Sequence, residues 1–303
     1  METCIRHMAG SRMKIILSRK GFDSGSGGVP SPIFPDGQLL SLPIPDKSSK
    51  ITYKRLSGNS WATVAELIGD LKAHRPNHGE LKTDDGAHLD PDLEQSRLPR
   101  KPGWRPLFGQ ADSAQSHLQN HGVDRGDIFL FFGLFRAVEK VDGHWRYLQH
   151  QQQKHVIWGW FQIDELIDLR QRRPDWNWAW YHPHFSLETR SKNVLYVAKR
   201  SLELPGLTAC NLPGAGTFPQ IMPDLQLTRP GSKLVSCWLL PKWIHPCGRR
   251  SVLTYHRNPS RWGTTLGGTI LSTVGRGQEF VLDCSDYPEA LNWLTDLVER
   301  CSH

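Results

Sequence analysis

Three residues at alternate positions, His88, Asp90 and Asp92, form the motif His-x-Asp-x-Asp. Alternate side chains of an extended backbone point to the same side, so the imidazole and the two carboxylates could converge. Such a set can act as a general acid and base, or it can bind a metal ion through mixed nitrogen and oxygen ligands. The alternative is an Asp-Pro-Asp turn that caps the next segment. We predict a catalytic role for the three residues together with Asp23, and we assign no metal ligand.

A second group of residues, near the N-terminus, could bind an anion. The apolar residues 15–17 lead directly into a polar, glycine-rich stretch. This order predicts a buried strand that opens into a loop, and loops at strand ends carry much of the binding chemistry of proteins. Glycine allows backbone N–H groups to turn toward a phosphate, although no standard phosphate-loop motif is matched and a plain surface loop is the alternative. The predicted phosphate-binding residues are Arg19, Lys20, Ser24, Ser26, Gly27 and Gly28.

Polar side chains in two further segments could contact a substrate. Gln110 and His117 lie at the start of a predicted helix, where the alternative for His117 is an ordinary surface or half-buried histidine. His182 and His184 lie in residues 173–186, a stretch crowded with tryptophan. The two imidazoles are separated by one proline and could reach the same ligand, either as a zinc pair or as part of an aromatic wall that faces a nucleotide. We favour the aromatic wall.

Two more sets of residues could hold the base and the phosphate of a nucleotide. Trp158 and Trp160 flank a glycine on a predicted strand, so both indole rings should lie on one face, where they could stack on a base or a sugar. The alternative is a large apolar core beneath a helix. Arg257, Asn258 and Arg261 lie in a predicted loop beside a tryptophan and could grip a phosphate, unless this loop is only a solvated basic turn.

The composition favours a globular protein with a negatively charged partner. The 303 residues include 37 Lys and Arg against 30 Asp and Glu, a formal charge of +7, which favours nucleotides or nucleic acid. The six cysteines contain no Cys-x-x-Cys pair and no secretory signal is visible, which argues against a disulfide scaffold and a structural zinc site. No apolar run approaches the ~18 residues of a membrane span. We predict a cytoplasmic protein that has no membrane partner.

Apolar periodicity predicts more strands than helices. Helices are expected over residues 61–72, 112–121 and 288–298, with a further short helix that begins at Asp164. Strands are expected over residues 15–17, 39–44, 128–135, 145–147, 155–163, 192–198, 234–240, 269–274 and 278–282. This order predicts one large α+β (mixed α/β) domain over residues 13–298. Residues 1–12 are expected to be a disordered extension, and residues 299–303 a short tail.

One block of the chain resembles a small β-barrel. Residues 123–166 run from a Gly-Asp turn through an apolar strand and a hairpin turn to a strand with a central glycine. This order resembles barrels of the PUA, ASCH and EVE kind, which hold RNA or modified bases. The resemblance implies a barrel-like region, extending over residues 123–200, within the larger domain.

Several blocks together resemble one bacterial family, the third type of nucleotide modification associated domain. The blocks are residues 13–37, 88–93, 109–118, 126–136 and 277–283, and the resemblance spans essentially residues 13–298. The family is linked through gene neighbourhoods to modified bases in phage and bacterial DNA. The resemblance implies a nucleotide or nucleic acid as partner, DNA rather than RNA, and assigns no role to any residue.

Three hypotheses about function follow from these observations. The leading one is a protein that binds or processes a nucleotide or a modified base in an aromatic pocket lined by Arg and Lys. The second is a reader that recognises a modified base without catalysis. The third is an enzyme like the ADP-ribosyltransferases, because residues 276–282 resemble their glutamate strand and would supply Glu279. The sequence decides neither the reaction nor the cofactor.

Overall fold

The computed structural model describes residues 13–73, 81–187, 190–207, 212–275, 277 and 279–302. These residues form a nine-stranded mixed sheet that carries the rest of the chain on its two faces. The main path of this sheet is β12 (Glu279–Asp283), β1 (Lys14–Arg19), β4 (Ile128–Val141), β6 (Lys154–Asp168), β7 (Asn193–Ala198) and β3 (Leu107–Ala111). Three short strands pair beside this path, namely β2 (Ser31–Ile33) and β5 (His144–Tyr147) with β4, and β8 (Ala215–Thr217) with β6.

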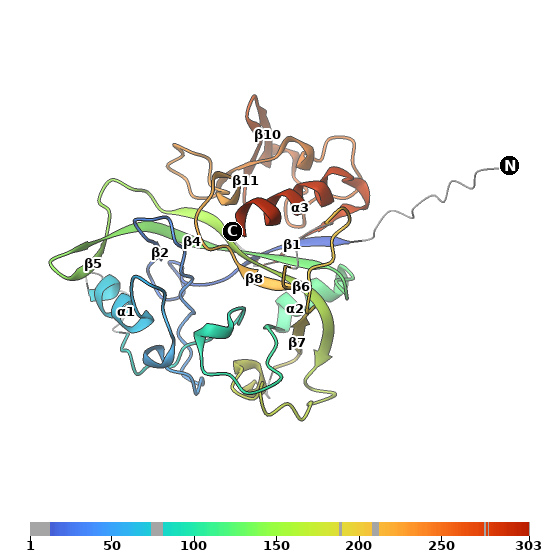
Figure 1. Ribbon diagram of the computed structural model, residues 1–303. Coiled ribbons are helices and arrows are strands. Elements are labelled where there is room, and N and C mark those ends of the chain that lie inside the picture. The colour runs from blue at the N-terminus through green and yellow to red at the C-terminus, as the bar shows by residue number, and fades with distance from the viewer. Residues whose placement is uncertain are drawn as a thin grey trace.

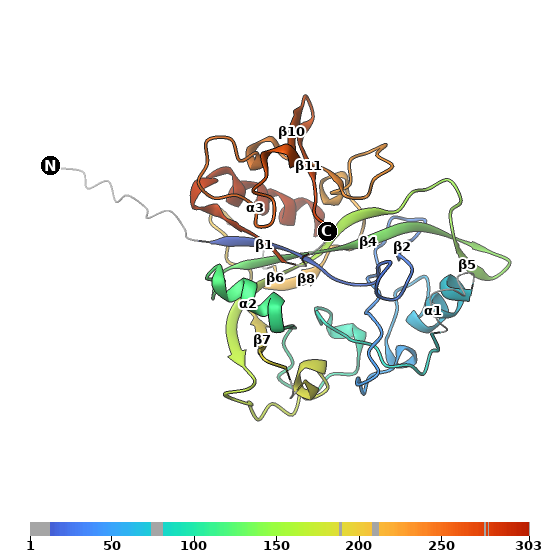
Figure 2. The same ribbon diagram turned by 180° about the vertical axis from the view of Figure 1, so that it is seen from behind.

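The two faces of the sheet are covered differently, as Figures 1 and 2 show from opposite sides. A helix, α3 (Glu289–Cys301), and a small three-stranded sheet lie over one face. The order of this small sheet is β10 (Trp262–Thr265), β11 (Gly268–Ser272) and β9 (Cys237–Leu240). The helices α1 (Val64–Ala73) and α2 (Asp112–Asn120) lie on the other side. None of the helices in the described residues is long and apolar enough to cross a bilayer.

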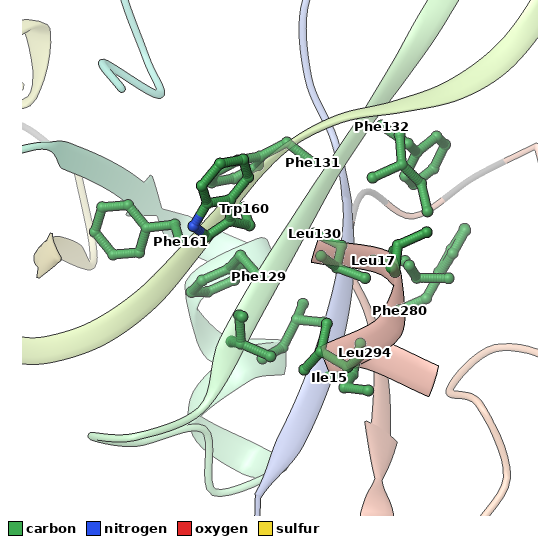
Figure 3. Close-up of a cluster of buried hydrophobic side chains, with 14 of the residues drawn as sticks. Ile15, Leu17, Phe129, Leu130, Phe131, Phe132, Trp160, Phe161, Phe280 and Leu294 are labelled. Atoms are coloured by element: carbon green, nitrogen blue, oxygen red, sulfur yellow. The ribbon is translucent and has the colours of Figure 1, made fainter. Parts of the chain in front are cut away.

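Strand alternation divides the apolar residues of β1 and β4 between these two faces. The strands are parallel, with Ile15 opposite Ile128 and Leu17 opposite Leu130. Figure 3 shows Ile15 and Leu17 on the side of Leu294 of α3. Phe129 faces the other side, where its ring contacts Phe161 at a centroid distance of 6.4 Å. The period of two in the sequence therefore gives the sheet an apolar core on each face.

The sheet curves until its edge strands approach each other. Phe108 of β3 contacts the rings of Phe129 and Phe131 on β4, at centroid distances of 4.9 and 5.2 Å, although β6 and β7 lie between β3 and β4 in strand order. Across the remaining gap Gln110 of β3 donates a hydrogen bond of 2.6 Å to Glu279 of β12. Side chains rather than a backbone ladder join the two edges, so the described strands do not form a closed barrel.

The predicted fold class is confirmed, with 12 strands and three helices in the described residues. The barrel expected over residues 123–166 is corrected, because β4, β5 and β6 belong to the open nine-stranded sheet. The short helix expected at Asp164 is also wrong. Strand β6 continues to Asp168 because its second half pairs with β7, with Ile167 opposite Leu195 and both side chains buried.

The chain ends differ from the predicted ends in one respect. Residues 1–12 lie outside the described residues, so the structure does not test the extension expected there. Residues 299–301, predicted as part of a tail, belong to α3, and the side chain of Cys301 is buried. The helix is longer than predicted because its apolar face continues to this cysteine.

One half-buried histidine gives the core a predictable dependence on pH. His155 of β6 lies against the rings of Phe132 and Trp238, at 5.3 and 5.7 Å, and its Nδ1 accepts a hydrogen bond of 3.0 Å from the Trp238 indole. Burial and the positive charge of Arg19 lower the pKa of His155 to about 3. In the unfolded chain the pKa is near the ordinary value of about 6.5, so the unfolded state binds the proton first as the pH falls.

We therefore expect the wild type to lose more stability in acid than His155→Gln, whose amide oxygen can still accept from Trp238. Below about pH 6.5 the free energy of unfolding of the wild type should fall by up to ~1.4 kcal/mol per pH unit more than that of the variant. Urea unfolding at a series of pH values measures this difference. The contributions of the other titrating groups are the same in both proteins and cancel. Equal pH slopes for the two proteins would contradict the prediction.

Candidate functional site

A cavity of about 590 Å³ opens beside the end of β1, the end of β3, the start of α2 and the start of β12. Nine of the predicted site residues line it, from four separate stretches of sequence: Arg19, Lys20, Asp23, Ser26, His88, Asp90, Gln110, His117 and His184. A larger cavity of about 950 Å³ lies on the side of α3 and is lined largely by apolar and uncharged polar residues. The smaller cavity is therefore the one that brings the predicted basic and acid–base residues together.

An ion pair forms part of the cavity wall. Lys20, directly after β1, places its Nζ 3.0 Å from Oε1 of Glu279, and Gln110 donates to the same oxygen. Both charged side chains are largely buried, with 11% and 1% of their surfaces exposed. The other carboxylate oxygen of Glu279, Oε2, is buried without a hydrogen bond partner among the described residues.

The glycine-rich loop is divided between two cavities. Oδ1 of Asp23 accepts hydrogen bonds of 2.8 Å from the amides of Gly25 and Ser26, and the amide of Gly28 donates to the Asp23 carbonyl. Ser24, Gly27 and Gly28 line a neighbouring cavity of about 660 Å³. Three loop amides thus face inward to Asp23, and of residues 23–28 only Asp23 and Ser26 line the cavity that holds His88.

Asp90 lies at the centre of a cluster of three histidines, hereafter the His–Asp cluster (His88, Asp90, His182 and His184). Oδ2 of Asp90 lies 3.7 Å from Nε2 of His88 and 3.4 Å from Nε2 of His184. Oδ1 lies 3.4 Å from Nε2 of His182 and accepts a hydrogen bond of 2.8 Å from the amide of Gly109. Of the set, His88, Asp90 and His184 could hold a metal ion, because one ligand atom from each lies within 4.8 Å of the others.

Two further residues orient these imidazoles. Asp46 Oδ2 lies 2.8 Å from Nδ1 of His88, and Asn193 Oδ1 lies 2.6 Å from Nδ1 of His184. Burial alone would lower the pKa of His88, but the carboxylates of Asp46 and Asp90 outweigh it and raise that pKa to about 9. Burial opposes ionisation of Asp90, yet the three imidazoles hold its pKa well below the ordinary value. His88 is therefore cationic at neutral pH and Asp90 is anionic.

Asp92 belongs to a different contact network from the other two residues of the motif. Its carboxylate receives two hydrogen bonds from Arg100, of 2.6 and 2.7 Å, and a third from the hydroxyl of Tyr181. The Arg100 guanidinium also lies 4.3 Å from the centre of the Trp104 ring. His88 and Asp90 therefore meet in the cavity. Asp92 instead forms a buried ion pair with Arg100 and a hydrogen bond with Tyr181.

The predicted aromatic residues lie in the core. Trp158 stacks on Phe131 at a centroid distance of 5.7 Å, and Trp160 packs on Phe218 at 5.0 Å and donates to a backbone carbonyl. Both indoles are at least 94% buried, as relative exposures of 6% and 3% show. His182 is also fully buried. These side chains fill the protein interior and leave the cavity wall to polar groups.

His117, on α2, also lines the cavity. Its ring stacks on Tyr255 at 4.5 Å, and its Nε2 lies 3.1 Å from Oγ1 of Thr254. Burial and the nearby charge of His121 lower the pKa of His117 to about 4, so its imidazole is neutral at physiological pH. A neutral imidazole beside an exposed tyrosine ring can accept or donate a hydrogen bond to a ligand.

The remaining predicted phosphate grip lies elsewhere. Asn258 caps a short turn by accepting from the amide of Ser260, and Arg261 donates to the carbonyl of Ser272. Arg257 is exposed on the same turn. The structure does not bring these three residues together with the cavity. Conversely, sequence reasoning missed Asp46 and Asn193, because an orienting partner for an imidazole has no local signal in the sequence.

The fold and the site together define an α+β protein with a polar cavity in which basic side chains lie beside a His–Asp cluster. Residues 14–283 match the family described as nucleotide modification associated domain 3, and the chain belongs to this family. The predicted resemblance is thereby confirmed over most of the chain. Comparisons with curated proteins and with solved structures found no match. The family description associates the protein with nucleotide modification.

Proposed function

We propose that the protein is an enzyme that modifies or processes a nucleotide or a modified base, in DNA rather than RNA. One observation carries the proposal: a single cavity of about 590 Å³ is lined both by basic side chains and by His88, Asp90 and His184 of the His–Asp cluster. This volume lies within the range of ~300–1,000 Å³ that is typical of small-molecule sites. A base within duplex DNA would have to flip out of the stack to enter the cavity.

The chemistry of the cavity suggests a role for each group. Arg19 and Lys20 would attract the phosphate of a nucleotide, since charge-assisted hydrogen bonds to phosphate are strong. His88, oriented by Asp46 and cationic at neutral pH, would donate a proton to the substrate or stabilise negative charge on it. Asp90 would stabilise positive charge, because a carboxylate with a strongly lowered pKa is a poor base.

An enzyme like the ADP-ribosyltransferases is the second candidate, because Glu279 lines the same cavity. A buried glutamate next to a lysine could contact a ribose hydroxyl of NAD. The reader hypothesis has less support, since the indoles that would stack on a base, Trp158 and Trp160, are buried in the core. A reader would bind a modified base and leave it unchanged.

The test is a binding panel with purified protein. Deoxynucleotides, ribonucleotides, short DNA and RNA strands and NAD are compared by thermal shift and calorimetry. We expect deoxynucleotides or DNA to bind, and Arg19→Ala to weaken that binding about 10-fold, which corresponds to the ~1.5 kcal/mol of a charge-assisted hydrogen bond. The slope of log affinity against log salt concentration should also become shallower by about one.

Two variants separate the alternatives. Arg172→Ala is the control, because Arg172 is exposed and does not line the cavity; its affinity should equal that of the wild type. His88→Gln should bind nucleotide and fail to convert it. Unchanged affinity and salt dependence in Arg19→Ala would refute the phosphate role. Binding of NAD alone would favour the transferase, and binding without any product would favour the reader.

We also propose a cytoplasmic location. The four cysteines in the described residues, Cys237, Cys247, Cys284 and Cys301, are free thiols. Free thiols are typical of reducing compartments. Fractionation of cells that express the full chain tests this proposal directly.

A further inference from the structure

The ligand atoms of the His–Asp cluster have the spacing of a metal site. From Oδ2 of Asp90 the distances are 3.7 Å to Nε2 of His88 and 3.4 Å to Nε2 of His184. Ligands ~2.1 Å from a tetrahedrally coordinated ion lie ~3.4 Å from one another. One ligand atom from each of the three residues lies within 4.8 Å of the others, so one cation could contact all three once the side chains move closer together.

Hydrogen bonds fix the direction in which each imidazole presents its lone pair. Asn193 donates through its Nδ2 to the carbonyl of His184, so its Oδ1 is the atom that accepts from Nδ1 of His184. Nδ1 of His88 likewise donates to the carboxylate of Asp46. Nε2 of each ring thus faces Asp90, while Nδ1 is held by Asp46 or Asn193. An ion bound there would displace the proton that His88 otherwise carries on Nε2, because a histidine that ligates a metal is neutral.

We infer that His88, Asp90 and His184 bind a divalent first-row transition-metal ion, with the remaining coordination positions open to the cavity. Two imidazoles and one carboxylate form the ligand set of many catalytic zinc and non-haem iron sites, in which the open positions take water or substrate. All three residues line the cavity. An ion there would act as a Lewis acid on a substrate in the cavity, or activate a water molecule.

His182 contacts Asp90 from the protein interior, on the side opposite the proposed ion. His182 is fully buried, and neither of its ring nitrogens has a hydrogen bond partner among the described residues. Its Nε2 is directed to the other oxygen of Asp90, at 3.4 Å. His182 and the Gly109 amide thus engage Oδ1 of Asp90, and Oδ2 is left to face His88 and His184.

The test is metal uptake by the full-length protein, stripped with a chelator and titrated with Zn²⁺ or Co²⁺ in the absence of nucleotide. We expect one equivalent to bind, with a visible absorption band for bound Co²⁺ and a melting temperature that rises with metal concentration. Mg²⁺ should not compete, because it prefers oxygen ligands. His88→Gln and Asp90→Asn should each raise the dissociation constant at least about 10-fold.

His144→Gln is the matched control, since His144 also has its Nδ1 2.8 Å from a carboxylate, that of Asp70, but lies outside the cavity. This variant should keep the wild-type affinity. If Asp90→Asn fails to fold, His88→Gln decides, because His88 is the more exposed of the two side chains. A folded wild type that takes up neither ion, or an unchanged dissociation constant in His88→Gln, would overturn the inference.

This inference rests on the proposed function, because the metal would act in the same cavity. The experiments therefore have to distinguish a failure of the metal site from a failure of the proposed substrate. Metal uptake is measured without nucleotide, and nucleotide binding is measured with the chelator-stripped protein. Nucleotide binding without metal uptake refutes only the metal site. Metal uptake without nucleotide binding refutes only the proposed substrate.

Discussion

Replacement of Arg100 by methionine is expected to lower the free energy of unfolding by about 3–5 kcal/mol. The guanidinium is bonded to both oxygens of Asp92, at 2.6 and 2.7 Å, and to the carbonyl of Glu94 at 2.6 Å. The side chains of Arg100 and Asp92 are 5% and 0% exposed. Arg100→Met would leave the Asp92 carboxylate buried without its cation, and this uncompensated charge accounts for most of the loss. Urea unfolding followed by circular dichroism measures it.

The control for this prediction is Arg125→Met. Arg125 also bonds a carboxylate, that of Asp164 at 2.8 Å, but 69% of its side chain is exposed. Its loss should cost less than ~1 kcal/mol. The double variant Asp92→Asn/Arg100→Met should recover part of the stability, because no charge remains buried. If Arg100→Met were as mild as Arg125→Met, the pair would not stabilise the fold. The pair also accounts for the position of Asp92, because Arg100 holds its carboxylate away from the cavity that contains Asp90.

Local patterns in the sequence were sufficient for most of the regular elements. The apolar residues 128–135 and 155–163 predicted β4 and β6, and the helical period predicted α1 and α3 within a few residues. Continuation of β6 to Asp168 could not be seen, because it depends on pairing with β7, a strand about 25 residues further along. The curvature of the sheet has the same origin, since it depends on contacts between β3 and β4 that lie far apart in sequence.

The candidate site was predictable in its residue types and less so in its geometry. His88 and Asp90 were found because their spacing is local, and His184 because a histidine in a crowded loop is conspicuous. The meeting of these residues is a result of the tertiary fold, as is their separation from Trp158. Asp92 has the same local spacing as Asp90, yet Arg100 competes for it. A side chain follows its strongest available partner, and sequence spacing alone does not identify that partner.

Gly109 is where the fold and the candidate site depend on each other most directly. A Cβ at this position of β3 would lie 2.2–2.6 Å from ring atoms of His184. Asn193 bonds both Nδ1 of that ring and the backbone carbonyl of His184, so the ring cannot simply turn away. We expect Gly109→Ala to lower the free energy of unfolding by about 2–3 kcal/mol, the upper part of the range for an overpacked core. Because the Gly109 amide also bonds Asp90, metal affinity should fall as well.

Gly263→Ala, in strand β10, is the matched control. The atom nearest to its added Cβ would be 3.9 Å away, an ordinary van der Waals contact, so its stability and its metal uptake should stay close to those of the wild type. Thermal unfolding and Co²⁺ titration of both variants make the comparison. If Gly109→Ala loses stability but binds Co²⁺ as tightly as Gly263→Ala does, the His184 imidazole is needed for packing and not for the metal. If both properties fall together, one imidazole serves the core and the site.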